Sequence, residues 1–119
     1  MQLGRAKEAT ADAEAALRQA LRPGHRLLLS CARIYGRAVG VFDTEGGRPA
    51  DSQQAFRYQE YALQLLREAL GAMPAAERAT FWRSKVSGDP AFRSIRNSRG
   101  WRELGRTYAR KGSSTPDSE

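Results

Sequence analysis

Side chains that could perform acid–base, nucleophilic or metal chemistry are few and scattered in this 119-residue sequence. The single histidine, His25, follows Pro23-Gly24, and its neighbours supply no cluster of His, Cys and carboxylate groups at metal-ligand spacing. We therefore expect His25 to be a turn or helix-start residue. The single cysteine, Cys31, cannot form an internal disulfide, and it lies in an apolar stretch where a thiol packs as a small hydrophobic group.

The carboxylates do not suggest acid–base catalysis either. Glu60, Glu68 and Glu77 stand among Arg and Gln residues, where solvated ion pairs are expected. The sequence contains neither a Gly-x-x-x-x-Gly-Lys phosphate loop nor a Gly-x-Ser-x-Gly nucleophile motif. We therefore expect a protein that is not an enzyme, with no catalytic residue, no cofactor and no metal.

Basic residues are the one chemical feature that is concentrated. The net charge is +7, and residues 78–111 alone contain ten Lys/Arg against two Asp/Glu, a balance of +8. Four arginines within this segment are three or four residues apart, so on a helix they form one stripe. They are Arg99, Arg102, Arg106 and Arg110. The stripe is interpreted either as a solvated outer face or as a surface for nucleic acid or another acidic partner. Trp82 and Trp101 nearby could stack on bases or pack in the core.

The elements that position these residues are predicted to be helices, because apolar residues recur at three- and four-residue steps. The pattern covers residues 5–22, 26–42 and 51–73, and breaker-rich segments at 22–24, 43–49 and 71–74 separate the three helices. Asp51 or Ser52 is the expected N-cap of the third helix. Gly36 and Gly40 interrupt the second helix, and close packing is the expected reason.

The last third changes character. Residues 75–86 predict a helix, Ser87-Gly88 breaks it, and Asp89-Pro90 supplies an N-cap followed by proline at the first helical position. A short helix and a final helix to about residue 110 follow, the latter capped by Asn97 or Ser98. Residues 111–119 are nearly devoid of apolar side chains and predict a disordered tail. The apolar residues expected to cover the core are Phe92, Ile95, Trp101 and Leu104.

An internal repeat relates the first and third helices. Ala13-x3-Leu17-x2-Ala20-Leu21 recurs 49 residues later as Ala62-x3-Leu66-x2-Ala69-Leu70. Periods of 20–50 residues are typical of stacked helical arrays, because one hairpin cannot bury its own apolar face.

The Ala/Leu rhythm of the repeat resembles the second helix of a tetratricopeptide repeat (TPR). Residues from about 27 to 104 further resemble the end-of-group domain that closes TPR arrays in bacterial proteins. The resemblance is carried by Cys31-Ala32-x2-Tyr35, Leu65-Leu66-Arg67-Glu68-Ala69, Asp89-Pro90-x-Phe92-x2-Ile95-Arg96 and Trp101-x2-Leu104. It implies an all-α fold, with one TPR-like helical hairpin followed by C-terminal capping helices. Because no kinase motif is present, the kinase activity of some members does not carry over.

These observations predict one TPR-like helical domain over residues 1–110 that acts as a protein–protein interaction or scaffold module. A protein or peptide partner is expected, with nucleic-acid or polyanion binding as the alternative and self-association open. Arg57 and Tyr58 are expected to be exposed for binding and Tyr61 to be buried, and Arg99, Arg102 and Arg106 are the other candidate contacts. No stretch approaches the roughly 18 apolar residues of a membrane helix, and no secretion signal begins the sequence, so the cytoplasm is the expected location.

Overall fold

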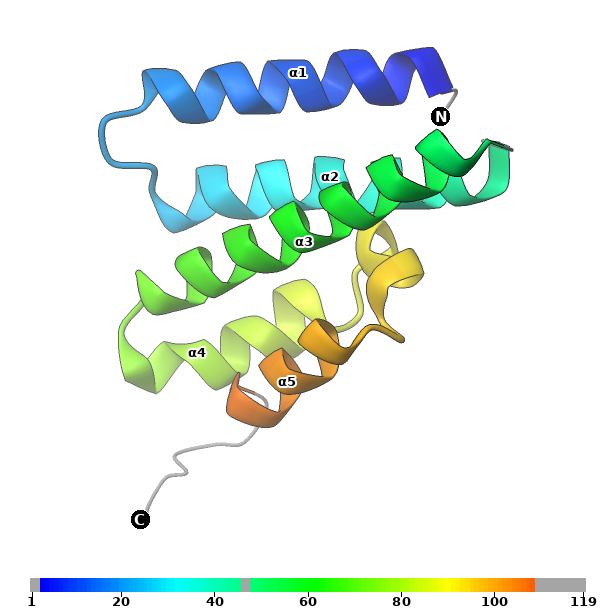
Figure 1. Ribbon diagram of the computed structural model, residues 1–119. Coiled ribbons are helices and arrows are strands. Elements are labelled where there is room, and N and C mark those ends of the chain that lie inside the picture. Colours follow the sequence, from blue (N-terminus) through cyan, green and yellow to red (C-terminus); the bar gives the residue numbers. More distant parts are fainter. Residues whose placement is uncertain (1–2, 46–47, 109–119) are drawn as a thin grey trace.

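A computed structural model describes residues 3–45 and 48–108, and all of its regular elements are helical (Figure 1). In chain order they are α1 (Leu3–Gln19), α2 (His25–Glu45), α3 (Pro49–Gly71), α4 (Ala75–Phe81), the π-helical turn η1 (Trp82–Val86), the 3₁₀ helix η2 (Pro90–Ile95) and α5 (Arg99–Tyr108). The all-α prediction is confirmed for these residues, and the predicted tail at 111–119 lies outside them. None of the described helices is long and apolar enough to cross a membrane.

The centre of the fold is the contact between α2 and α3, the most extensive between any two elements. Both helices carry buried small and large apolar side chains at helical spacing, as the periodicity predicts. On α2 these include Leu28, Cys31, Ala32, Tyr35, Ala38, Val39 and Phe42, and on α3 Ala55, Ala62, Leu65, Leu66, Ala69 and Leu70. In Figure 1, α1 lies on one side of this pair, and α4 and α5 lie on the other.

The first helix ends earlier than predicted, and only some of the repeated residues occupy equivalent positions in the two helices. Ala13 and Ala62 are both buried, but Leu21 is 100% exposed whereas its counterpart Leu70 is 0% exposed. Pro23 disfavours helical backbone at the residue before it, and α1 stops at Gln19, which leaves Leu21 outside the helix. The expectation that Leu21 shares the core face was therefore wrong.

The predicted loop at 43–49 is shorter than expected. Helix α2 continues to Glu45, and the Thr44 hydroxyl donates to the carbonyl oxygen of Gly40 at 2.8 Å. Helix α3 already begins at Pro49, with Arg48 as its N-cap, because proline lacks only an N–H that the first helical turn does not use. Asp51 and Ser52, the two predicted N-caps, both lie inside the helix instead. Asp51 is the third helical residue, and its carboxylate accepts from the backbone N–H of Arg48 at 3.3 Å.

Arg78 closes the C-terminus of α3. Its Nε donates to the carbonyl oxygens of Leu70 (2.8 Å) and Met73 (3.1 Å), and its Nη2 donates to that of Gly71 (3.2 Å). A cation is favourable there because the last carbonyls of a helix lack intrahelical partners and carry partial negative charge. Arg78 therefore belongs to the structure of the α3–α4 corner rather than to the basic surface.

The chain from Asp89 to Tyr108, which contains η2 and α5 and is called the closing segment below, begins with the predicted Asp-Pro cap. The Asp89 carboxylate accepts from the backbone N–H of Ala91 at 2.9 Å, and Pro90 is the first residue of η2. This segment approaches α2 at its two glycines: a Cβ at Gly36 would lie 2.6 Å from the Ala91 carbonyl oxygen, and one at Gly40 would lie 2.7 Å from the Ser94 Oγ. Close packing as the reason for both glycines is confirmed.

The four apolar residues expected to cover the core are all buried, which confirms that prediction. Trp101 of α5 packs against Trp82 of η1, with ring centroids 4.9 Å apart, and against Phe92 of η2 at 5.5 Å. Ser98 rather than Asn97 caps α5, because the Trp101 backbone N–H donates to the Ser98 Oγ at 3.2 Å. The aromatic cluster thus fixes α5 on the bundle.

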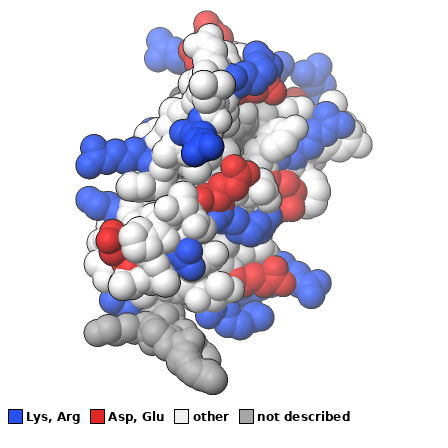
Figure 2. Space-filling model, turned by 90° about the vertical axis from the view of Figure 1, so that its left-hand side faces the viewer, with Lys and Arg blue, Asp and Glu red and all other residues white. Residues whose placement is uncertain are grey.

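Acidic and basic side chains are mixed over part of the surface. The face in Figure 2 carries Lys and Arg side chains interspersed with Asp and Glu side chains. A surface of that composition does not generate a strong potential of one sign.

Candidate binding groove

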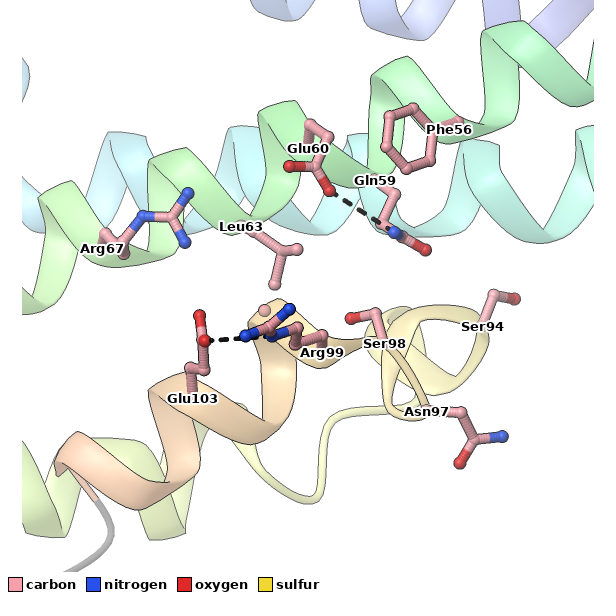
Figure 3. A pocket seen from close by; sticks show the side chains of 11 residues that line it. Phe56, Gln59, Glu60, Leu63, Arg67, Ser94, Asn97, Ser98, Arg99 and Glu103 are labelled. Carbon is pink, nitrogen blue, oxygen red and sulfur yellow. Dashed lines mark hydrogen bonds and ion pairs between the residues drawn. The ribbon is translucent and has the colours of Figure 1, made fainter.

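A groove of about 890 Å³ runs between the outer side of α3 and the segment from η2 to α5 (Figure 3). It is the larger of two neighbouring cavities between α3 and α5. Its lining combines one aromatic ring with amide, hydroxyl and charged groups. The residues are Phe56, Gln59, Glu60, Leu63 and Arg67 on α3, and Ser94, Asn97, Ser98, Arg99, Gly100 and Glu103 on the opposite wall.

The two walls meet where Gly100 faces Leu63. A Cβ at Gly100 would lie 2.6 Å from the Leu63 Cδ1, so a side chain there would push α5 away from α3. Leu63 is 1% exposed, and Figure 3 shows it pointing from α3 towards the start of α5. A second cavity of about 190 Å³ continues beyond this contact and shares Arg67, Gly100 and Glu103 with the first.

Charged groups of both signs stand on the walls. Arg99 Nε lies 3.5 Å from Glu103 Oε2 on α5, and both side chains are well exposed. On α3, Gln59 Nε2 donates to Glu60 Oε2 at 3.5 Å, and Arg67 Nη2 donates to the Gln64 side chain at 3.5 Å. Exposed contacts of this length are weak, so these side chains can rearrange around a ligand at small cost.

Phe56 is the exposed apolar feature of the groove. Its side chain is 61% exposed, and Figure 3 shows the ring at the upper end of the cavity. The same ring borders a neighbouring depression of about 520 Å³ that also involves Ser52, Gln53 and Arg57. Arg57 is exposed there, as predicted.

The two tyrosines of α3 lie opposite to expectation. Tyr58 is buried at 9% exposure, and its hydroxyl is hydrogen-bonded to the Thr10 Oγ1 of α1 at 3.1 Å. Tyr61 is 52% exposed and contacts Tyr35 at a centroid distance of 5.5 Å. The expectation that Tyr58 offers an exposed binding surface was wrong, because α1 covers it; the expectation that Tyr61 belongs to the core was wrong as well.

The arginines predicted on the final helix occupy two settings. Arg99 lines the groove, whereas Arg102 and Arg106 are exposed on α5 outside it. Arg110 lies beyond the described residues.

Phe56 was not singled out from the sequence, although the pattern contained a signal for it. Phe56 lies off the predicted core face of α3, and a large aromatic residue in such a position marks a candidate contact.

Burial raises the pKa values of two side chains of α2, the Cys31 thiol and the Tyr35 phenol. Removal from water raises the pKa of the Cys31 thiol, and the Cys31 Sγ contacts the carbonyl oxygen of Ala13 at 3.8 Å. Burial first, and then the Glu14 charge, raise the pKa of Tyr35 to about 12. Both groups keep their protons at neutral pH, which agrees with a packing role for Cys31.

Comparison of the chain with protein-family models, curated proteins and solved structures gave no match.

Proposed function

We propose that this chain is a non-enzymatic protein-interaction module that holds a peptide segment of a partner in the groove between α3 and α5. The observation that carries the proposal is the exposed Phe56 ring inside a cavity of about 890 Å³ with polar groups on both walls. Recognition sites combine an apolar anchor with a few polar groups that fix orientation.

The dimensions suit a short segment. From Phe56 to Arg67, α3 rises about 17 Å at 1.5 Å per residue, a length that about five extended residues span. A large apolar side chain of the partner would cover Phe56, and a carboxylate would pair with Arg67, which lines the same wall. The net charge of +7 also favours an acidic segment.

The scaffold in this proposal is a TPR-like hairpin made by α2 and α3. Its support is the burial of residues that carry the resemblance in the sequence: Cys31, Ala32 and Tyr35 on α2, and Ala62 and Ala69 on α3. The closing segment then covers the apolar face that a last hairpin leaves open.

A random peptide library selected on the immobilised protein tests the proposal. We expect enriched peptides to share a large apolar residue next to acidic residues, and Phe56→Ala to weaken binding of a labelled selected peptide about tenfold or more. Tyr61→Ala is the matched control, since it removes an exposed aromatic ring of the same helix outside the groove. Equal losses in the two variants, or no convergent peptides, would contradict the proposal.

A further inference from the structure

Helix α5 carries a row of three arginines, which we call the arginine ridge: Arg99, at the edge of the groove, and Arg102 and Arg106, outside it. All three are exposed, while Trp101 and Leu104 of the same helix are buried against the bundle. Positions three and four residues apart share a helix face, so three guanidinium groups lie along about 10 Å of helix.

One guanidinium group of the ridge is held in place by a backbone hydrogen bond. Arg102 Nη1 donates to the Asn97 carbonyl oxygen at 3.0 Å, which holds its guanidinium near the start of α5. A guanidinium has five N–H donors, so one such bond leaves others for a second acceptor. Between Pro90 and Tyr108 there are five arginines and one acidic residue, Glu103, a local balance of +4.

The identity of these cations selects among anionic ligands. Seventeen of the twenty basic residues in the chain are arginine, and the ridge contains no lysine. Arginine presents a planar fork that binds phosphate oxygens in pairs, which a lysine ammonium cannot do. The ridge is therefore suited to oxyanions that offer oxygen atoms in pairs, and phosphate is one of these.

The aromatic residues on which α5 packs are buried, which argues against base stacking on the ridge itself. Trp82, Phe92 and Trp101 are at most 8% exposed, so they offer no platform on which the bases of a single strand could stack. The apolar side of α5 is equally covered, so the helix offers no wedge for a lipid surface. The ridge therefore offers guanidinium groups that can contact the phosphate backbone of a nucleic acid, and none of its three residues carries an aromatic ring on which bases would stack.

We propose that the arginine ridge binds the phosphate backbone of double-stranded nucleic acid without sequence specificity. This surface differs from the peptide groove in two of its three residues, because Arg102 and Arg106 do not line the groove, whereas Arg99 does. Contact with phosphates releases condensed counterions, so the affinity must fall steeply as salt rises.

The test uses fluorescence anisotropy of a labelled random-sequence duplex with the full chain, beginning at about 50 mM salt. We expect binding whose logarithm falls linearly with the logarithm of the salt concentration. Replacing Arg99, Arg102 and Arg106 together by Gln should reduce affinity at least tenfold and lower the slope by about 2.7, the value for three lost phosphate contacts. Glutamine preserves helix propensity, and circular dichroism confirms that α5 is not lost.

A matched variant separates a local site from net charge. Arg5→Gln, Lys7→Gln and Arg18→Gln remove the same three charges from exposed positions of α1, at the other side of the molecule. We expect this variant to keep most of the affinity. Equal losses in the two triple variants would overturn the proposal, as would the absence of duplex binding at the lowest salt. Equal or tighter binding of poly-glutamate, of phosphatidylserine vesicles or of a single strand would also overturn it.

Discussion

The Arg33 Nε lies 2.8 Å from the Asp89 Oδ2, so an ion pair ties the start of the closing segment to the middle of α2. The Asp89 side chain is only 10% exposed, and its other oxygen caps η2 through the Ala91 N–H. The same carboxylate thus stabilises the first turn of η2 and holds η2 against α2.

Replacing Asp89 should separate these two contributions. Asp89→Ala removes both the cap and the ion pair, and we expect it to lower the free energy of unfolding by about 1 to 3 kcal/mol. Asp89→Asn retains a cap acceptor and should lose less. Chemical denaturation followed by circular dichroism measures both, and equal losses would rule out a contribution from the cap hydrogen bond.

The glycines of α2 should not tolerate a methyl group. Gly36→Ala gains about 1 kcal/mol of helix propensity, but its Cβ would meet the Ala91 backbone carbonyl at 2.6 Å, so we expect net destabilisation. Gly4→Ala is the control: it lies in α1 with no heavy atom within 4 Å of the added Cβ, and should be neutral or slightly stabilising. Thermal unfolding compares them, and a more stable Gly36→Ala variant would contradict the close approach.

The two tyrosines of α3 should differ in their response to loss of the hydroxyl group. Tyr58→Phe breaks a buried hydrogen bond to Thr10 between α3 and α1, at an expected cost of about 1 kcal/mol. Tyr61→Phe changes an exposed ring and should leave the free energy of unfolding unchanged. Urea titrations of the two variants and the parent chain decide this, and an unchanged Tyr58→Phe midpoint would argue against the interhelical bond.

Stability should fall in strong alkali because of Tyr35. Its pKa is raised from 10.0 to about 12 in the folded chain, so the folded state holds the phenolic proton more tightly than the unfolded state does. The resulting stabilisation is fully present below pH 10.0 and is lost as the pH rises towards about 12. Tyrosinate absorbance against pH should show one late-titrating group, which Tyr35→Phe removes. A titration in which no tyrosine is delayed would refute the shift.

Much of the architecture could be predicted from sequence because helical periodicity and breaker residues are local signals. The Asp89 cap, the packing role of Gly36 and the cover by Phe92 and Ile95 are confirmed on that basis. The predictions that were wrong concern residues whose burial depends on which other element packs against their helix. The motif of α1 matches that of α3, but it ends at an exposed Leu21, whereas the corresponding Leu70 is fully buried.

The binding surfaces were less predictable for the same reason. Tyr58 and Tyr61 are three residues apart, and both fit the edge of one helical stripe. Which ring is covered depends on tertiary neighbours: Thr10 of α1 and Phe42 of α2 both contact Tyr58. The groove itself depends on the approach of α5 to α3 at Gly100, a contact between segments 37 residues apart in sequence that no local pattern encodes.

The contact between Trp82 and Trp101 has a practical consequence. These are the only tryptophans in the sequence, and their rings meet at the junction of η1 and α5. Indole emission therefore originates entirely from the place where the final helix is attached. A ligand that shifts α5 should therefore change the tryptophan emission of the unlabelled wild-type chain, so displacement of α5 can be followed without an added label.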